Sequence, residues 1–275
     1  MILFMQITLV VPCFNEEAAI GPCLDAVLGQ TRQFDEIIVV DNNSTDRTLE
    51  VVRRYVDRLP IRVLTETRQG VAWASQCGYN AASGDVIARI DADTRVEPAW
   101  AAVVDEYLSG HPEVDGVGGF SWLYDMPRLN MRKAAFARAA KFGADSSGTR
   151  PVLVGNNMAI RKSAWDAARV RVKNLPGTHE DLDVTYALKD AGRGDFRSLP
   201  GMVVSLSPRT YLVSPKVTMR YLAAIMRTAG LYGRRKDQAF CAATIPINIV
   251  LFLAYGIVVR RLSDSTESRV SPVTR

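Results

Sequence analysis

The chain has 275 residues, of which 48% are hydrophobic and 23% charged, and its formal net charge is +5. This composition supports one substantial core or two small ones and excludes a disordered tail or a fibrous repeat. The four cysteines include no CxxC pair, so the sequence suggests neither a zinc site nor a disulfide framework.

The positive charge is concentrated in one segment. Residues 196–236 contain eight basic residues and no acidic residue, and the rest of the chain is therefore net negative. The eight are Arg197, Arg209, Lys216, Arg220, Arg227, Arg234, Arg235 and Lys236. Because an uncharged run follows, this segment favours contact with anionic lipid headgroups over a nucleic-acid groove.

Short apolar runs rich in β-branched residues alternate with helix-period stretches through the first ninety residues. The runs are at 7–11, 36–40, 61–64 and 86–90, and the helical stretches are at 18–28, 45–56 and 71–82. This alternation predicts a parallel sheet with helices on both faces. The strand at 36–40 is continuously apolar after Glu36, as expected for a strand covered on both sides.

Polar clusters follow three of these strands, at 13–17, 41–46 and 91–94. The carboxyl ends of parallel strands meet at one edge of a sheet, where ligands bind. In the second cluster we expect Ser44 or Thr45 to cap the next helix, which leaves Asp41 for a ligand.

The regular rhythm is lost after a helix predicted from Pro98 to Leu108 and a strand at 116–120. The later patterns are a basic helix at 129–143, a short extended segment at 149–152, and a helix that opens at 177–183 and ends near Gly192. A mixed second half is therefore expected.

The C-terminal part has two features that suggest a membrane. Arg220, Arg227 and Arg234 recur every seven residues, which predicts a basic face on an interfacial helix. Residues 239–259 are all uncharged, and a run of that length can just cross a bilayer of ~30 Å. Because Pro246 and Asn248 weaken a straight span, a re-entrant anchor and a buried hairpin broken at Pro246 remain open.

Asp91 and Asp93 close a predicted strand, and two carboxylates at this spacing can hold a divalent cation through hard oxygens. The pattern alone is weak, because Asp181 and Asp183 repeat it. A solvated turn at the strand end is the alternative reading.

Four segments resemble, in the right order, the motif series of family 2 glycosyltransferases. They are ValValProCysPheAsnGluGlu at 10–17, ValValAspAsnAsnSerThrAsp at 39–46, ArgGlnGlyValAlaTrpAlaSer at 68–75 and IleAspAlaAspThr at 90–94. Segments 155–162 and 179–183 are similar to the acceptor-side segment and the Glu-Asp motif of that family. The resemblance covers residues 6 to about 205 and implies a GT-A fold, which is a Rossmann-like mixed α/β sheet flanked by helices.

The resemblance also implies roles for individual residues. Asp41 would bind the nucleobase, Asp91 the ribose or the metal, and Asp93 an Mg²⁺ or Mn²⁺ ion on the diphosphate. Asp181 would be the general base, with Glu180 beside it. The residues expected at the nucleotide sugar are Pro12, Phe14, Asn15, Glu17, Asp41, Asn43, Arg68, Asp91, Ala92 and Asn156. His179 abuts the acidic cluster and is either a ligand of the metal or acceptor or a solvated cap.

The implied organisation is a catalytic domain at 1–205, a basic amphipathic segment at 206–236, a hydrophobic membrane anchor at 237–261 and a polar tail at 262–275. The expected reaction is metal-dependent, inverting transfer of a sugar from a nucleotide-diphosphate donor to a hydroxyl acceptor. The acceptor would be lipid-linked or an envelope glycan at the cytoplasmic face of the cell membrane, and no nucleic acid is expected.

Two other classes of protein remain as alternatives. A membrane-anchored protein that binds nucleotide sugars without turnover would keep the same fold. A pyrophosphorylase-like nucleotidyltransferase would need a glycine-rich basic loop after its first strand, and CysPheAsnGluGlu at 13–17 is unlike that loop.

Overall fold

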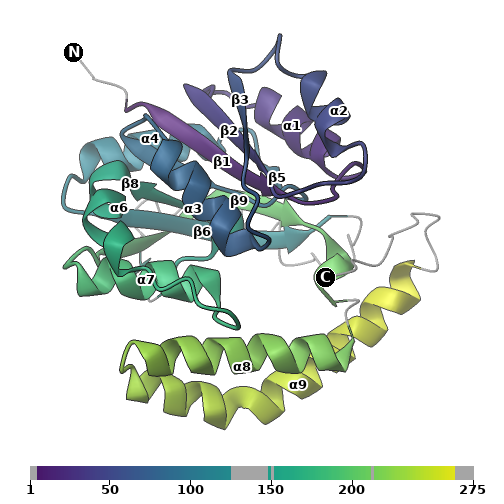
Figure 1. The fold of residues 1–275 in the computed structure, drawn as a ribbon, viewed down its shortest axis with the longest axis vertical. Helices are drawn as coiled ribbons and strands as arrows, with labels where there is room; N and C mark the ends of the chain where they lie inside the picture. Colours follow the sequence, from purple (N-terminus) through teal and green to yellow (C-terminus); the bar gives the residue numbers. More distant parts are fainter. Residues whose placement is uncertain (1–4, 125–147, 150–151, 212–213, 264–275) are drawn as a thin grey trace.

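The computed structural model describes residues 5–124, 148–149, 152–211 and 214–263 (Figure 1). The strands are β1 (Ile7–Cys13), β2 (Glu36–Asp41), β3 (Ile61–Thr65), β4 (Val86–Arg89), β5 (Arg95–Val96), β6 (Gly116–Leu123), β7 (Gly148–Thr149), β8 (Met158–Arg161) and β9 (Phe196–Leu206). The α-helices are α1 (Ile20–Leu28), α2 (Thr48–Arg53), α3 (Val71–Ala81), α4 (Trp100–Gly110), α6 (Lys162–Ala168), α7 (Glu180–Asp190), α8 (Pro215–Leu231) and α9 (Arg235–Ser263). Short 3₁₀ turns are η1 (Gly155–Asn157), η2 (Arg169–Arg171) and η3 (Pro208–Tyr211).

One mixed sheet forms the centre of the molecule, and within the described residues its order is β3-β2-β1-β4-β8-β6-β9-β5, with β7 beside β9. The first four strands run parallel, as the β-α alternation predicts. Strand β8 is antiparallel to both β4 and β6, while β9 runs parallel to β6. The mixed second half is therefore confirmed.

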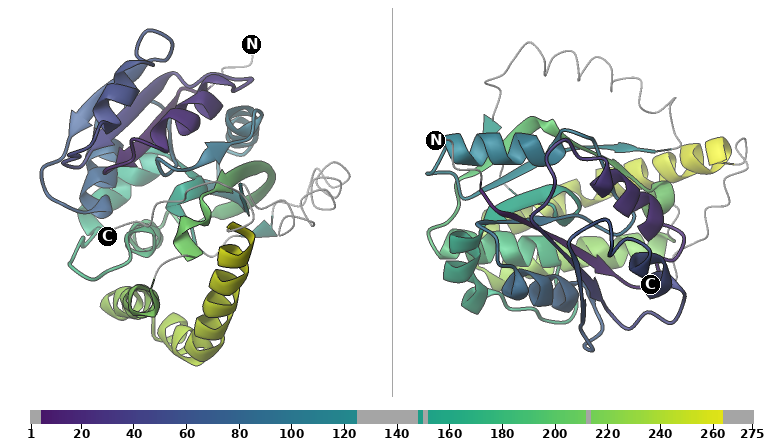
Figure 2. Two further views of the ribbon diagram at one scale, coloured as in Figure 1. Left: turned by 90° about the vertical axis from the view of Figure 1, so that its right-hand side faces the viewer. Right: turned by 90° about the horizontal axis from the view of Figure 1, so that it is seen from above.

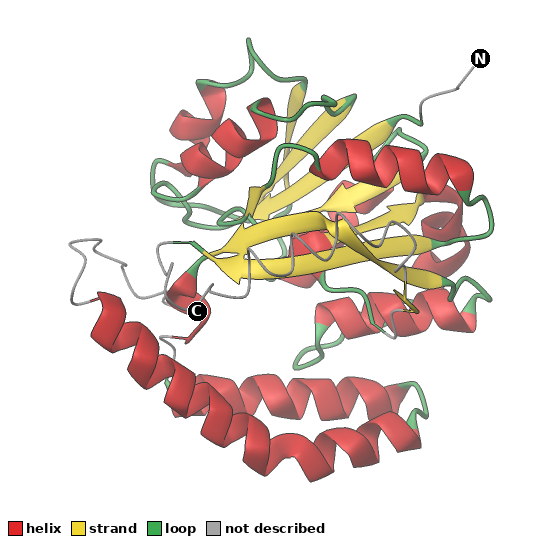
Figure 3. Ribbon diagram, turned by 180° about the vertical axis from the view of Figure 1, so that it is seen from behind, coloured by secondary structure: helices red, strands yellow, loops and turns green. Residues whose placement is uncertain are grey.

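Helices cover both faces of the sheet (Figure 3). Alternate residues of β1, such as Leu9 and Val11, pack with α1, α2 and α4. Val10, which points to the other face, belongs to the cluster with α3, α6 and α7. This alternation follows from the two-residue period of a strand and accounts for its continuous apolar sequence.

Helices α8 and α9 form a hairpin that lies outside the α/β body, on the far side of α7 from the sheet (Figures 1 and 2). Leu182 and Tyr186 of α7 pack with Ala229 of α8 in a small separate core. Because α7 is covered by the sheet on one side and the hairpin on the other, most of its side chains are buried.

Helix α2 begins later than the predicted stretch at 45–56. Asp46 Oδ1 accepts hydrogen bonds from the backbone N–H of Thr48, at 3.0 Å, and from its hydroxyl, at 2.5 Å. Asp46, rather than Ser44 or Thr45, therefore satisfies the start of this helix, and that expectation was wrong. The basic pattern at 129–143 and residues 150–151 of the extended segment lie outside the described residues.

The C-terminal segment is one helix that continues through Pro246, so the alternative of a hairpin broken at Pro246 is wrong. Figure 3 shows that α9 curves, as expected for a helix with an internal proline. Among the described helices, none has the combined length and apolarity that a membrane crossing requires. Of the three arginines predicted to form a basic face, Arg220 and Arg227 share a face of α8, whereas Arg234 lies in the turn between α8 and α9.

Candidate active site

The candidate site lies where the carboxyl ends of β1, β2 and β4 meet. Strand β1 lies between β2 and β4. The chain therefore moves to one side of β1 to form β2 and β3, and then to the other side of β1 to form β4. Such a reversal opens a crevice at the strand ends. The register places Cys13 opposite Asp41, and Asp91 and Asp93 follow β4 directly. The sheet thus brings the three predicted polar clusters to one edge, as expected.

Arg209 joins the first and third clusters. Its Nη2 donates to Glu16 Oε2 at 2.8 Å and to Asp93 Oδ2 at 2.6 Å. Its Nε donates to the hydroxyl of Ser207 at 3.2 Å, which fixes the guanidinium from behind. Desolvation raises the pKa of Glu16, and repulsion by Asp93 adds to this effect, although Arg209 opposes it.

A second arginine, Arg89, joins the segment that follows β4 to helix α7. Its side chain is only 2% exposed, and it lies at the end of β4. Its Nη2 donates to Asp91 Oδ1 at 2.8 Å, and its Nη1 donates to Asp181 Oδ1 at 2.6 Å. Glu180 is more distant, with its Oε1 4.0 Å from Nη2. The buried guanidinium therefore orients both Asp91 and the predicted base Asp181.

The acidic charge at this edge exceeds the basic charge, because the two guanidiniums face five carboxylates. The pKa of Asp91 is raised to about 6, mainly by desolvation, and repulsion from Asp93, Asp181 and Glu180 adds to the shift while Arg89 opposes it. A surplus of carboxylate charge of this kind is relieved by a bound cation.

The donor set fits a divalent metal. Asp91 and Asp93 offer hard carboxylate oxygens, which Mg²⁺ prefers and Mn²⁺ accepts. Within the described residues, no group of three or more acidic, thiol or imidazole side chains forms a closed metal cage. Asp91 and Asp93 are therefore the residues that would hold such an ion.

The turns after β1 and β2 bind each other. Asn15 Oδ1 accepts the backbone N–H of Thr45 at 2.8 Å, and the Asn15 N–H donates to the hydroxyl of Ser44 at 3.1 Å. Asn15 and Asn43 both have positive φ, at 53° and 67°, which asparagine tolerates better than most residues. Asp41 is buried, and its Oδ1 accepts the Ser44 N–H at 3.2 Å. These turns are therefore ordered around the predicted nucleobase position.

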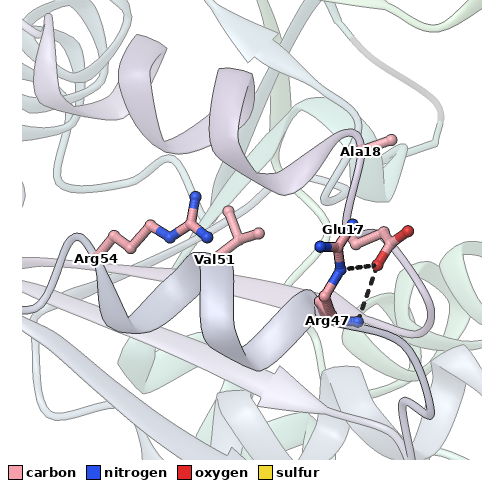
Figure 4. A pocket seen from close by; sticks show the side chains of 5 residues that line it. All are labelled: Glu17, Ala18, Arg47, Val51 and Arg54. Carbon is pink, nitrogen blue, oxygen red and sulfur yellow. Dashed lines mark hydrogen bonds and ion pairs between the residues drawn. The ribbon is translucent and has the colours of Figure 1, made fainter.

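Glu17 pairs with Arg47. Its Oε2 accepts the backbone N–H of Arg47 at 3.0 Å and the Arg47 Nε at 3.3 Å (Figure 4). Both residues line a cavity of about 320 Å³ with Ala18, Val51 and Arg54. None of the predicted ligand-binding aspartates lines that cavity. Glu16, which the sequence does not single out, takes the position beside Asp93.

The remaining predicted nucleotide-sugar residues differ in how accessible they are. Pro12 is buried within β1, and Ala92 packs into the core, so neither side chain is accessible from the surface. Phe14 is exposed and Asn156 partly exposed. Arg68 is exposed, pairs with Glu66 at 2.8 Å and has its guanidinium 3.8 Å from the Trp73 ring centre.

Asp183 and His179, which lie in the same segment as Asp181, form hydrogen bonds within the protein. Both oxygens of Asp183 accept backbone N–H groups, from Lys173 at 3.1 Å and Asn174 at 2.7 Å. His179 is buried, its N–H donates to Thr228 Oγ1 at 2.8 Å, and its ring packs edge-on against Tyr221. The expectation of a solvated cap at His179 was therefore wrong, because the residue lies between α7 and α8.

Comparison with known proteins identifies the family. The family model described as "Glycosyl transferase family 2" matches residues 8–166 of the chain. The chain belongs to glycosyl transferase family 2. The resemblance noted from its motifs is therefore confirmed.

Two curated relatives come from rhizobia. A dodecaprenyl-phosphate galacturonate synthase of Rhizobium johnstonii is 38% identical over 100 residues, or 34% of this chain and 30% of that protein. A lipopolysaccharide core biosynthesis glycosyltransferase, LpsC, of Rhizobium meliloti is 34% identical over 105 residues, or 38% of this chain and 37% of that protein. The matched part of the chain thus spans about a third of the length of these relatives.

Solved structures share the fold at low sequence identity. A mannosyltransferase from Pyrobaculum calidifontis, in complex with GDP-Man and Mn²⁺, aligns over 97% of this chain and 77% of its own, with a TM-score of 0.60 and 20% identity. TarS 1–349 of S. aureus, in complex with UDP-GlcNAc, aligns over 82% of this chain and 66% of its own, with a TM-score of 0.61 and 18% identity. These likenesses support the mixed α/β fold and carry no residue roles.

Sequence reasoning missed both arginines of the site. Arg89 carried a usable signal, because it is the one charged residue in the apolar run at 86–90. Arg209 carries no such signal, and the sequence groups it with the basic residues that are expected to contact lipid headgroups. In the structure Arg197 pairs with Asp195 and Arg234 with Asp190, so these cations also belong to the protein body.

Proposed function

We propose that the chain transfers a sugar from a nucleoside-diphosphate donor to a hydroxyl acceptor in a metal-dependent, inverting single displacement. The observation that carries this proposal is the pairing of Asp91 and Asp181 through Arg89 at the edge of the sheet where Arg209 holds Asp93. Membership of glycosyl transferase family 2 supports the reaction class.

In this proposal Asp91 and Asp93 hold a divalent ion, which when bound supplies the positive charge that stabilises the departing diphosphate. The turns at Asn15 and Asn43 line the nucleotide, and Asp41 contacts its base. These residues bind and orient the donor.

Asp181, with Glu180 beside it, accepts the proton of the acceptor hydroxyl, and such a base contributes typically ~10²–10⁴-fold to the rate. Arg89 holds Asp181 in position. Burial raises the pKa of the Cys13 thiol to about 12, so this thiol is not a competing nucleophile beside the site. A separate base without an enzyme nucleophile supports a single displacement with inversion.

We also propose that the acceptor is lipid-linked or an envelope glycan and that the C-terminal hairpin rests on the cytoplasmic face of the cell membrane. The names of the two rhizobial relatives, a dodecaprenyl-phosphate galacturonate synthase and a lipopolysaccharide core biosynthesis glycosyltransferase, support such an acceptor.

The site is tested by two substitutions with opposite expected effects. Nucleotide binding is measured by calorimetry, with and without Mn²⁺, for UDP, GDP and their sugar conjugates, and turnover is measured as release of the nucleoside diphosphate. Asp93→Ala should lose the Mn²⁺-dependent part of nucleotide binding. Asp181→Asn should keep binding within about twofold and lose turnover by at least ~10².

The matched control is Asp57→Ala, because Asp57 is an exposed carboxylate outside the site. It should bind and turn over the donor like the wild type. If Asp93→Ala keeps its Mn²⁺-dependent binding, the proposed metal site is wrong. Binding without turnover by the wild type, with every donor and acceptor, would favour the nucleotide-sugar-binding protein.

A further inference from the structure

Arg209 places its positive charge beside the carboxylate that the proposed function assigns to the metal. Its Nη2 is 2.6 Å from Asp93 Oδ2 and lies 3.1 Å and 2.8 Å from the two oxygens of Glu16. We propose that Arg209 is a resident counter-ion of the diphosphate site, which a divalent cation must displace from Asp93 before it can bind there. This inference rests on the proposed function.

Water has little access to the ion pair between Arg209 and Asp93. The side chains of Arg209 and Asp93 are only 18% and 20% exposed, so water screens their attraction much less than at an open surface. The Ser207 hydroxyl accepts from Arg209 Nε and keeps the guanidinium directed at the acids. A divalent ion on Asp93 would meet this cation at close range, and like charges repel.

The displaced guanidinium has a new partner when a donor is bound. A nucleoside diphosphate brings phosphate oxygens to the same edge of the sheet, and the planar fork of arginine pairs with phosphate in a bidentate manner. Arg209 lies on the short turn η3 directly after β9, so its long side chain can exchange partners without a change in the sheet. Metal and donor would then load together, because the donor accepts the cation that the metal displaces.

This exchange predicts opposite effects of one substitution on two ligands. Arg209→Gln should bind Mn²⁺ alone about tenfold more tightly than the wild type, because a charge-assisted competitor is removed. The same variant should bind UDP or GDP about tenfold more weakly at saturating Mn²⁺, because a phosphate partner is lost. Arg209→Lys, which keeps the charge without the fork, should fall between the wild type and Arg209→Gln for both ligands.

Calorimetric titration of Mn²⁺ alone, followed by UDP or GDP into the Mn²⁺-saturated protein, measures both effects. Arg197→Gln is the matched control, because Arg197 is also ion-paired and lies on β9, with Asp195 as its partner at 2.7 Å. It should bind both ligands like the wild type. Thermal unfolding of each variant tests whether the changes arise from misfolding.

The double variant Arg209→Gln with Asp93→Asn should lose the gain in Mn²⁺ affinity. If Arg209→Gln binds Mn²⁺ no more tightly than the wild type, the counter-ion role of Arg209 is overturned, whatever happens to nucleotide binding. The proposed function fails on a different result, namely Mn²⁺-dependent nucleotide binding that survives in the single variant Asp93→Ala. The two failures are therefore distinguishable.

Discussion

The Arg89 side chain occupies a space that is open only because residue 155 is a glycine. A Cβ atom on Gly155 would lie 1.2 Å from Arg89 Nη1 and 2.5 Å from Asp181 Oδ1. Both contacts are far inside van der Waals distance, so any larger residue at position 155 must move the guanidinium. A buried charge that loses its partners is costly, and this one residue therefore protects both stability and the geometry of the acids.

We expect Gly155→Ala to lower the free energy of unfolding by about 3–5 kcal/mol, as is typical when a buried ion pair is broken, and to reduce turnover more than Mn²⁺-dependent nucleotide binding. Urea unfolding followed by circular dichroism measures the first effect. Gly110→Ala is the control, because a Cβ there meets no atom within 4 Å. Equal stability of the two variants would show that Arg89 is not confined as described.

At the scale of elements, Glu36 joins the start of β2 to three neighbouring segments. Its carboxylate accepts the backbone N–H of Ser83 at 2.9 Å, the hydroxyl of Thr8 at 2.8 Å and Nη2 of Arg62 at 2.8 Å. Desolvation alone would raise the pKa of Glu36, but these hydrogen bonds outweigh it, and the pKa is lowered from its ordinary value of 4.5.

Because the folded protein holds Glu36 ionised, its contribution to stability is complete above about pH 4.5 and is lost as the pH falls below that value. We expect Glu36→Gln to cost about 1–2 kcal/mol at pH 7 and to approach wild-type stability as the pH falls through the lowered pKa of Glu36. Chemical unfolding at a series of pH values measures the difference. A difference from the wild type that stays constant between pH 7 and pH 3.5 would contradict the assignment, and Glu106→Gln, on an exposed face of α4, is the control.

The first four strands were predictable because each is a contiguous apolar run between polar turns. Strand β9 was not, since it contains Pro200 and Gly201 and reads as a loop until β6 pairs with it. Likewise Asn157 lies in a polar turn in the sequence, yet it is buried and accepts a hydrogen bond from Trp100 Nε1 at 2.8 Å. Tertiary pairing decides both cases.

The same distinction applies to the candidate site. The acids could be predicted because they follow strands, and the local sequence shows where a strand ends. Their arginine partners could not, since the contact between Arg209 and Asp93 joins residues 116 positions apart. No local pattern encodes such a contact, and the charge of Arg209 alone equally suits a lipid surface.

At the scale of the whole molecule, the hairpin presents an apolar stripe to the outside. The exposed side chains recur at intervals of three and four residues along α9, as on one face of a helix. They are Phe240, Ala243, Ile247, Val250, Ala254 and Ile257. Exposed cations lie on the same hairpin, at Lys216, Arg220, Arg227, Arg235 and Lys236. Such a combination suits a helix that lies in the plane of an anionic membrane surface.

We expect the full chain to sediment with vesicles of phosphatidylcholine and phosphatidylglycerol, and to do so less with phosphatidylcholine alone or at high salt. Ile247→Asp should weaken binding to the anionic vesicles by about tenfold, because it places a charge in the stripe. Val56→Asp adds the same charge to an exposed apolar residue beyond α2 and should have no effect. Equal sedimentation of the two variants would contradict a membrane-facing stripe.

The position of α7 between the sheet and the hairpin has a practical consequence for the design of a shortened chain. Three hydrogen bonds join α7 to the hairpin. The backbone N–H of His179 donates to Thr228, the Tyr186 hydroxyl donates to Asp237 at 3.0 Å, and the Tyr232 hydroxyl donates to Asp183. A chain truncated after β9 would lose all three hydrogen bonds and would expose one side of α7 to solvent. The hairpin is thus a brace for the helix that carries the proposed base, and a minimal active fragment has to extend at least to Asp237.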